Sequence, residues 1–284
     1  MPDSRWHHIK SAAFKLGLKL IPAKKGLTFL TLHHLEDCEF EWLGNILDYL
    51  KKEHDFIDVS DIDQGDFINC ESNNKGIVLT FDDAFKCHRK IADSLLAPSD
   101  IKALFFVPTE FIGLTGSDAF EFTKHKFFPN SSPKNLEKGS YDAMDWDDLQ
   151  SLVKLGHTIG AHTRSHPVLS SISETQLYSE ISEPANFLEE KLNIEISHFA
   201  YPFGSIESVN TLAFIEAKKR FKWAYSNIRG MSKDSPCRHF IYRQNILPKS
   251  PIWLVDAIVK GRLDIKYKKV HSRTSKKYLA NVDA

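Results

Sequence analysis

A strand, a helix and a second strand follow one another between residues 77 and 107, and this order is the strongest constraint on the fold. Residues 77–80 form an apolar run typical of a buried strand, and residues 85–96 repeat apolar side chains at helical spacing. Residues 103–107 are again apolar, until Pro108 stops the run. A helical crossover of this kind makes its two strands parallel. The sequence therefore predicts an α/β protein with a parallel sheet.

The same alternation continues along most of the chain. Further strands are expected at residues 27–32, 56–59, 194–201, 223–226 and 240–242. Further helices are expected at residues 39–52, 146–155, 176–192, 205–220 and 253–259. Residues 109–145 interrupt the alternation, because they have no periodicity of their own. A long loop in a compact domain usually has a function, so this segment is predicted to be a lid or a wall of the substrate site.

Length and charge limit the classes of protein that the chain can belong to. A chain of 284 residues suits one large domain or two small ones. Its hydrophobic content of 42% and charged content of 26% are those of an ordinary soluble globular protein. Lys+Arg and Asp+Glu are both 37, and no motif resembles a base-reading element. Nucleic-acid binding is therefore not expected.

The cysteines and the first residues bear on the compartment. Four scattered cysteines form no Cys-x-x-Cys pair, which favours reduced thiols over a structural disulfide. The amino terminus has neither an apolar core nor a small-residue cleavage site typical of a signal peptide. No stretch approaches the roughly 18 apolar residues that span a bilayer. A cytoplasmic location is the prediction.

Both ends of the chain are basic. Residues 1–26 include apolar side chains at helical spacing with lysines between them. This segment is interpreted either as a helix packed against the main domain or as a basic amphipathic anchor at the inner face of a membrane. Residues 263–284 are basic and polar, which predicts a solvated tail, with a phosphate- or membrane-binding patch as the alternative.

Two clusters of polar residues follow predicted strands and indicate a metal site. Asp82 and Asp83 stand next to each other at a strand's end, where their mutual repulsion and desolvation are relieved by a metal ion or a proton. His162 and His166 are four residues apart, and on a helical turn such positions share one face and reach one ion.

Three motifs occur in order: Thr-Phe-Asp-Asp at residues 80–83, His-Thr-Arg-Ser-His at residues 162–166 and Tyr-Pro-Phe-Gly at residues 201–204. They resemble the first three motifs of the polysaccharide deacetylases, the NodB-homology or carbohydrate esterase 4 family. The similarity of pattern covers roughly residues 27–262. It implies a single domain with an incomplete, distorted (β/α)7 barrel, in which residues 109–145 are a long loop insertion.

The resemblance also implies roles for residues of the motifs. Asp83, His162 and His166 are the expected metal ligands, and one oxygen with two nitrogens suits Zn²⁺, although Co²⁺, Ni²⁺, Mn²⁺ or Fe²⁺ fit the same donors. Asp82 is expected to be the general base. The backbone N–H of Phe203 is expected to stabilise the oxyanion.

Further substrate contacts are expected near the motifs. Tyr201 and Pro202 belong to the third motif, which in relatives forms a wall of the site. His34 matches a histidine at the end of the first strand in relatives, near the mouth of the pocket. The alternative for His34 is a solvated side chain that caps a strand.

The chain departs from the family pattern at two places. Many relatives have an arginine that orients the base two residues before the proline of the third motif, where this chain has Ala200. Arg243 and Arg164 are candidate replacements, or else surface charges. The late Leu-x-His motif that supplies a general acid is not evident. His239 lies near the expected region, and His34 or the returning proton of the base are other sources for the proton that the leaving amine needs.

The sequence thus predicts a metal-dependent hydrolase acting on linear amide C–N bonds, a carbohydrate N-deacetylase. Its substrate is expected to be an amino sugar with an acetyl or a formyl group, which differ by one methyl. The predicted location points to a nucleotide- or lipid-linked intermediate of surface polysaccharide synthesis. The alternatives are an amidase acting on a small non-carbohydrate amide, and a non-catalytic metal-containing barrel that binds a glycan or a partner.

Overall fold

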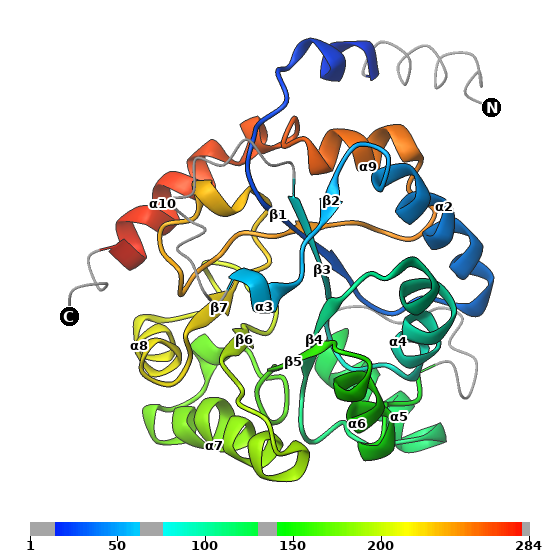
Figure 1. Ribbon diagram of the computed structural model, residues 1–284. Coiled ribbons are helices and arrows are strands. Elements are labelled where there is room, and N and C mark those ends of the chain that lie inside the picture. The colour runs from blue at the N-terminus through cyan, green and yellow to red at the C-terminus, as the bar shows by residue number, and fades with distance from the viewer. Residues whose placement is uncertain (1–14, 63–75, 130–140, 280–284) are drawn as a thin grey trace, which may run out of the picture.

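The computed structural model describes residues 15–62, 76–129 and 141–279, and it contains one curled sheet surrounded by helices (Figure 1). The strands run in the order β7-β6-β5-β4-β3-β1-β8, with β2 pairing to β3 beside this path, and all of these pairings are parallel. The strands are β1 (Thr28–Leu32), β2 (Asp55–Phe56), β3 (Gly76–Phe81), β4 (Ala103–Val107), β5 (Thr158–Ala161), β6 (His198–Ala200), β7 (Trp223–Tyr225) and β8 (Gln244–Asn245).

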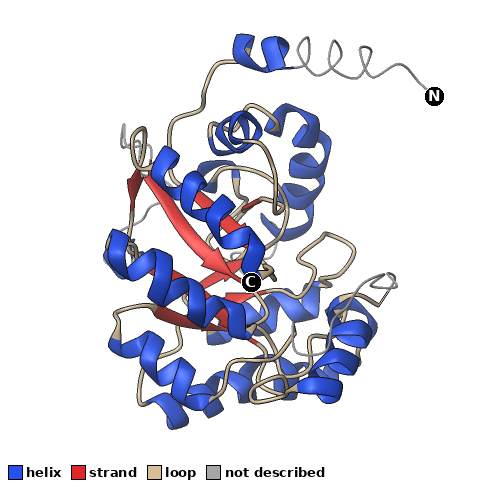
Figure 2. Cartoon of the chain, turned by 90° about the vertical axis from the view of Figure 1, so that its right-hand side faces the viewer, coloured by secondary structure: helices blue, strands red, loops and turns tan. Residues whose placement is uncertain are grey.

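Helices cover the outside of the sheet, as the two perpendicular views show (Figures 1 and 2). They are α2 (Phe40–Leu50), α3 (Val59–Ile62), α4 (Lys86–Ile91), α5 (Gly116–Phe122), α6 (Trp146–Lys154), α7 (Glu174–Leu192), α8 (Thr211–Arg220), α9 (Ile252–Val259) and α10 (Lys268–Tyr278). This arrangement confirms the predicted incomplete (β/α) barrel.

One irregular segment, residues 241–245, spans the opening of the barrel. Ile241 forms a bridge with Tyr225 of β7, while Gln244 and Asn245 pair with β1 at the other edge of the sheet. The strand expected at residues 240–242 is therefore displaced toward β8. The two sheet edges come together through this segment, which matters for the site described below.

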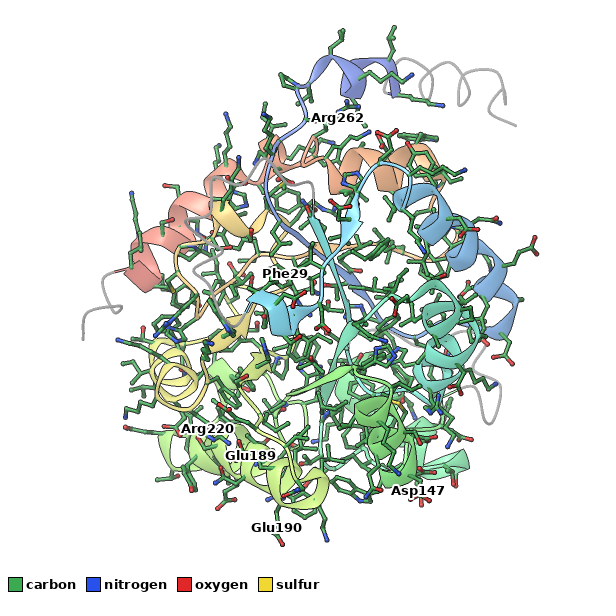
Figure 3. All side chains as sticks on the ribbon, viewed as in Figure 1. Phe29, Asp147, Glu189, Glu190, Arg220 and Arg262 are labelled. Atoms are coloured by element: carbon green, nitrogen blue, oxygen red, sulfur yellow. The ribbon has the colours of Figure 1, made fainter. Side chains whose placement is uncertain are left out.

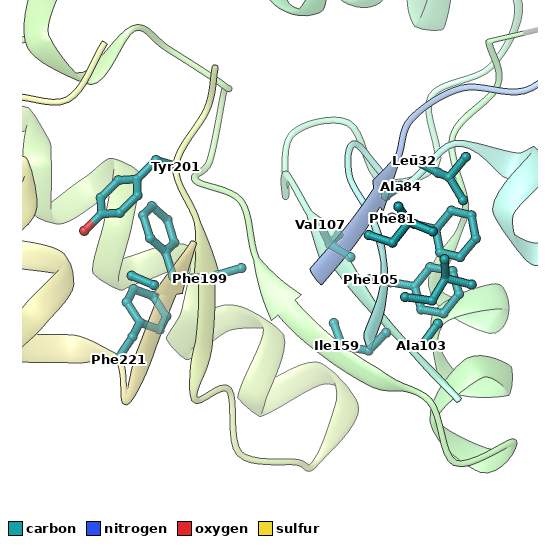
Figure 4. Packing of buried hydrophobic residues seen from close by; sticks show 14 of the residues in the cluster. Leu32, Phe81, Ala84, Ala103, Phe105, Val107, Ile159, Phe199, Tyr201 and Phe221 are labelled. Carbon is teal, nitrogen blue, oxygen red and sulfur yellow. The ribbon is translucent and has the colours of Figure 1, made fainter. Parts of the chain in front are cut away.

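The strands are buried on both faces, as parallel strands with helical crossovers require. Side chains of one parity pack outward against the helices, including Phe81, Phe105 and Phe199 (Figure 4). Side chains of the other parity fill the inside of the barrel, including Phe29 and Phe106. Phe29 lies in the middle of the molecule, whereas charged groups such as Glu190 extend at its periphery (Figure 3).

Some predicted boundaries were wrong for local reasons. Strand β2 ends at Phe56, because Val59 already begins the short helix α3. Helix α8 begins at Thr211, six residues later than expected, because the Asn210 side chain caps it by accepting a hydrogen bond from the Ala213 N–H at 2.8 Å. The preceding Ser205 and Ser208 bond to each other's backbone instead of entering a helix.

Residues 109–145 are not a structureless loop, contrary to the prediction. They contain α5 and a π-helical turn, η4 (Thr123–Phe127), whose aromatic side chains pack around Phe85 and Phe111. The Phe-rich composition therefore serves a small core of its own. Residues 130–140 lie outside the described part of the chain.

The carboxyl-terminal segment is likewise folded where a solvated tail was expected. A 3-10 turn, η7 (Asp264–Tyr267), leads into α10, whose inward side is formed by Val270, Thr274 and Tyr278. Tyr278 is fully buried, stacks on Phe240 at 4.2 Å and donates a hydrogen bond to the Val209 carbonyl. The sequence did not reveal this helix, because its three inward residues, spaced four apart, are surrounded by basic residues. Residues 280–284 lie outside the described range.

The basic amino-terminal segment is helical over residues 15–20, and residues 1–14 are outside the described part. Leu18 is buried, but Leu16 and Leu20 are 64% and 80% exposed. The interpretation as a helix whose leucine stripe packs against the barrel is therefore wrong for these two residues. This short helix lies at the edge of the molecule (Figure 2), where Lys15 lies over the ring of Trp253 of α9 at 5.9 Å.

The expectations about membrane spans and cysteines can be checked for the described residues. Within residues 15–62, 76–129 and 141–279, the structure contains no helix with the length and hydrophobicity of a membrane span. Cys38, Cys87 and Cys237 are unpaired, as expected for reduced thiols, and Cys70 falls in the range that is not described.

Candidate active site

The inside of the barrel changes from apolar to polar toward the carboxyl ends of the strands. Side chains two residues apart on a strand point to the same face, so the inward column that starts at Val78 continues through Thr80 to Asp82. The neighbouring column of β1 runs from Phe29 through Thr31, whose hydroxyl lies 3.0 Å from that of Thr80. The apolar layer supports a polar layer above it, where the candidate site lies.

Asp83, His162 and His166 converge in this polar layer. The Oδ1 atom of Asp83 lies 3.4 Å from His162 Nε2 and 3.6 Å from His166 Nε2, and all three residues are buried. The three ligand atoms lie within 4.8 Å of one another, so one ion can contact all of them.

The two histidines meet without a helix, which corrects the prediction. They lie on the loop after β5, where Thr163 and His166 have positive φ angles of 67° and 56°. The His166 N–H donates to the Thr163 hydroxyl at 3.0 Å, and the Glu180 carboxylate of α7 accepts from the Ser165 N–H and hydroxyl. The loop, not a helical repeat, turns both imidazoles toward Asp83. Positive φ at non-glycine residues is a strain typical of functional sites.

Backbone carbonyls orient both imidazole rings. His162 Nδ1 lies 2.8 Å from the Ala200 carbonyl oxygen, and His166 Nδ1 lies 3.1 Å from that of Lys126. A carbonyl can only accept, so each Nδ1 carries the proton and each Nε2 keeps a lone pair directed at Asp83. The buried Oδ1 of Asp83 has no hydrogen-bond partner in the described part of the chain. These residues fit a divalent metal ion.

The protonation states agree with this arrangement. Burial, together with the neighbouring His162, lowers the pKa of His166 to about 4, so its imidazole is neutral at pH 7. Burial opposes ionisation of Asp83, yet the adjacent His162 and His166 hold its pKa below the usual value. A carboxylate and a neutral imidazole are the forms that bind a metal.

Asp82 is held by Arg243 at the closure of the barrel. The guanidinium Nη1 and Nη2 atoms donate to Asp82 Oδ1 and Oδ2, both at 2.7 Å, and Nε donates to the Ser226 carbonyl. Both side chains are buried. Burial opposes the charge on Asp82, but the bidentate guanidinium keeps its pKa well below the usual range. The structure thus places Arg243 on Asp82, while Arg164 is exposed and pairs with Glu110.

The third motif forms a tight turn after β6. Phe203 and Gly204 have φ angles of 59° and 52°, and the Gly204 N–H donates to the Pro202 carbonyl at 2.6 Å. The Phe203 ring lies against His166, with ring centres 4.8 Å apart. Among the described residues, the Phe203 N–H donates no hydrogen bond, so it is free to bind a ligand oxygen.

A pocket of about 350 Å³ opens beside the metal ligands. His34 is in its lining and stacks on Tyr141, with ring centres 4.4 Å apart. His33 also lines the pocket, and its Nε2 atom lies 3.6 Å from Asp82 Oδ2. Sequence reasoning overlooked His33. Counting two residues on from the inward Thr31 would have placed it beside Asp82.

Besides Asp82 and Arg243, which are buried next to the pocket, three predicted site residues do not line it. Tyr201 has the outward parity of Phe199, and its hydroxyl donates to the His239 carbonyl at 2.9 Å within the core. Pro202 is buried in the turn behind Phe203. His239 is buried near Phe214, where burial lowers its pKa to about 4. Two asparagines that sequence reasoning also missed, Asn227 and Asn245, do line the pocket.

Similarity to known proteins is extensive in structure and partial in sequence. The Streptococcus pyogenes deacetylase PplD, solved in complex with acetate, superposes with a TM-score of 0.62 at 19% identity, covering 84% of this chain and 99% of that one. IcaB from Ammonifex degensii gives a TM-score of 0.65 at 18% identity, with 84% and 98% covered. The de-N-acetylase from Aggregatibacter actinomycetemcomitans gives 0.60 at 13% identity, with 82% and 99% covered. At these identities the similarity establishes the fold.

Family membership rests on the sequence itself. No curated protein sequence matches the chain. Residues 70–220, more than half of the chain, match the family described as polysaccharide deacetylase, and this range includes all three motifs. The chain therefore belongs to the polysaccharide deacetylase family.

Proposed function

We propose that this protein is a metal-dependent hydrolase that removes an N-acyl group from an amino sugar. Family membership supports hydrolytic deacetylation of a carbohydrate. The observation that carries the metal-dependent assignment is that two adjacent carboxylates have different partners. Asp83 converges with the imidazoles of His162 and His166, while both oxygens of Asp82 accept hydrogen bonds from Arg243.

In this proposal, three residues bind the metal ion and a fourth accepts a proton. Asp83, His162 and His166 would hold the metal ion, zinc or another divalent metal, which when bound acts as a Lewis acid. Hydrolysis adds water across the amide C–N bond, so one proton must leave the water and one must reach the amine nitrogen. Asp82, kept ionised by Arg243, would take the first proton.

The second proton needs a donor on the pocket side of Asp82. His33 lines the pocket 3.6 Å from Asp82 Oδ2, whereas His239 is buried away from it. We assign His33 rather than His239 to this step. The Phe203 N–H would donate a hydrogen bond to the acyl oxygen as negative charge develops there.

A more specific substrate can be proposed from the family and from the predicted location. We propose an acetyl or formyl group on a nucleotide- or lipid-linked intermediate of surface polysaccharide synthesis, in the cytoplasm. Release of acetate and of formate from free, nucleotide-linked and lipid-linked amino sugars, compared with release from small cyclic amides, separates this proposal from the amidase alternative. Turnover of only the cyclic amides would reject the sugar substrate.

Substitution of each carboxylate tests the division of roles. Asp82→Asn is expected to lower kcat about 10²–10⁴-fold and to leave metal binding intact. Asp83→Asn is expected to abolish both activity and the rise in melting temperature that zinc produces in the wild-type protein. Metal content, thermal shift with zinc and acyl release are measured on the same preparations. Zinc stabilisation without release from any substrate would favour the non-catalytic barrel, and equal zinc shifts in both variants would reject the ligand set.

We also propose that the amino-terminal helix binds an anionic membrane surface. The exposed Leu16 and Leu20 lie four residues apart on one side of the helix. Lys15 directly precedes Leu16, and Lys19 directly precedes Leu20. Replacing both leucines by serine should reduce co-flotation with phosphatidylglycerol vesicles, whereas Leu212→Ser, at an exposed position of α8, should not. Equal flotation of the two variants would reject this surface.

A further inference from the structure

Two asparagine side chains face the candidate pocket close to the closure of the barrel. Asn227 follows the inward-facing Tyr225 by two positions, and Asn245 pairs in register with the inward-facing Thr31. Both residues line the pocket and are partly exposed. They are therefore on the same inner surface as Asp82 and the metal ligands.

The amide groups of both residues are incompletely bonded. The Oδ1 atoms of Asn227 and Asn245 are buried and have no hydrogen-bond partner in the described ranges. Buried polar atoms are normally paired, because an unpaired one is unfavourable. Among the described residues that line the pocket, Asp83 Oδ1 is the only other buried side-chain atom without a hydrogen-bond partner, and that atom faces the proposed metal ion. The pattern indicates atoms whose partner is a ligand.

The backbone of each asparagine is firmly held, although its side chain is not. The Asn227 N–H donates to the Gly204 carbonyl at 3.0 Å, and a Cβ atom on Gly204 would come within 2.2 Å of the Asn227 nitrogen. The Asn245 carbonyl accepts a hydrogen bond from Arg229 Nη2 at 2.8 Å. Both amides are thus presented from fixed positions, one next to Phe203 and one next to β1.

The rest of the pocket lining complements the face of a sugar ring. Phe128, Tyr141 and Leu247 contribute apolar surface, and Leu247 is 68% exposed. A pyranose has apolar C–H faces and hydroxyl groups at its edge, and a side-chain amide can both donate to and accept from a hydroxyl. The volume of about 350 Å³ is at the lower end for ligand pockets, which fits one sugar unit better than several.

We infer that Asn227 and Asn245 bind hydroxyl groups of the sugar unit that carries the acyl amide, and so determine which sugar is accepted. This inference rests on the proposed function, because it assigns the substrate contacts of the same site. An amidase for an apolar amide would have no partner for these two atoms.

The test combines protein variants with substrate analogues. Asn227→Ala, Asn245→Ala and the exposed control Asn45→Ala are assayed with an N-acetyl hexosamine and with analogues that each lack one ring hydroxyl. We expect each pocket variant to raise KM about tenfold or more with a smaller change in kcat, and to lose most of the discrimination that the wild type shows against one deoxy analogue. Asn45→Ala should behave as the wild type.

Two further measurements separate the possible failures. Binding of the same sugars to the Asp82→Asn protein, by calorimetry, reports recognition without turnover, and melting temperatures show that the variants are folded. Removal of an unpaired amide should leave the melting temperature unchanged or higher. If the wild type turns over the sugar and both pocket variants have its KM and its discrimination, this inference is overturned and the proposed function stands. Sugar binding that needs both asparagines but gives no turnover supports it and rejects the hydrolase. Absence of both binding and turnover rejects both.

Discussion

At the scale of single residues, the Asp82–Arg243 pair is the interaction on which the site most depends. Two buried groups of opposite charge are joined by two hydrogen bonds of 2.7 Å. Removing one partner of a buried ion pair leaves the other charge uncompensated. The resulting loss of stability exceeds the net stabilisation that the pair provides. The arginine therefore acts on Asp82 in two ways, by keeping it ionised and by fixing its direction.

Arg243→Gln is expected to lower the free energy of unfolding by about 3–5 kcal/mol at pH 7. It is also expected to move the acidic limb of the pH–rate profile to higher pH, because burial alone raises the pKa of Asp82. Arg243→Lys keeps the charge but not the bidentate geometry, so it should retain more stability than Arg243→Gln. The exposed Arg164→Gln is the control and should change stability by less than about 1 kcal/mol.

The sign of the pH effect follows from the direction of each pKa shift. In the wild type the pKa of Asp82 is lowered, so its contribution is present above about pH 4 and is lost as the pH falls through the lowered pKa. In Arg243→Gln the pKa of Asp82 is raised, so that variant loses stability as the pH rises. Urea unfolding should show the difference between the two proteins shrinking as the pH falls from 7 to 3. A difference that is constant from pH 7 to 3 would contradict the pairing.

At the scale of secondary structure, α10 packs against the barrel, although its basic, polar composition predicts a solvated tail. Its Tyr278 lies between Phe214 and Phe240, and Lys277 donates to the carbonyls of Ile206 and Val209 that precede α8. The helix thus fastens the loop before α8 as well as its own end.

Tyr278→Ala is expected to reduce the free energy of unfolding by about 3–5 kcal/mol, because it removes a fully buried aromatic side chain. Leu279→Ala, at the next position and 48% exposed, should stay within about 0.5 kcal/mol of the wild type. Urea denaturation followed by circular dichroism measures both. If the two variants were equally stable, α10 would not be docked as described.

The same scale explains which features could be predicted from sequence. Strands such as β3 and β4 are short apolar runs between helices, so their local pattern is enough. The motif residues Asp82, Asp83, His162 and His166 are close to strand ends and were found for that reason. The loop after β5 could not be predicted, because a spacing of four occurs equally in a helix and in a turn with positive φ.

The other site residues depend on which strands become neighbours. Arg243 and Asn245 reach Asp82 and the pocket only because residues 241–245 span the gap between β7 and β1. His33 was passed over in favour of His34, because the choice between adjacent residues depends on the parity of β1. Parity is visible only once the inner face of the sheet is known.

At the scale of the whole molecule, Lys24 ties the beginning of the described chain to its last third. Its ammonium group lies 2.5 Å from Asp234 Oδ2 and 3.1 Å from Asp264 Oδ2, and Asp264 is buried. The other oxygen of Asp264 accepts from Gln244 of β8 at 2.8 Å. This network therefore joins the segment before β1 to the strand that closes the barrel.

Lys24→Ala is expected to lower the free energy of unfolding by about 1–3 kcal/mol, because it leaves the buried Asp264 carboxylate with one fewer charged partner. Lys90→Ala, which breaks an exposed pair with Asp37, should cost less than about 1 kcal/mol. Thermal or urea unfolding of both variants gives the comparison. A smaller loss for Lys24→Ala than for Lys90→Ala would show that the network is not structural.

The long separation of Asp82 and Arg243, 161 positions apart, has a consequence for the order in which the protein matures. A ribosome completes the proposed metal ligands, and the Ala200 carbonyl that orients His162, well before it adds Arg243. In the proposed mechanism, hydrolysis therefore requires a residue that is added to the chain after all three proposed metal ligands.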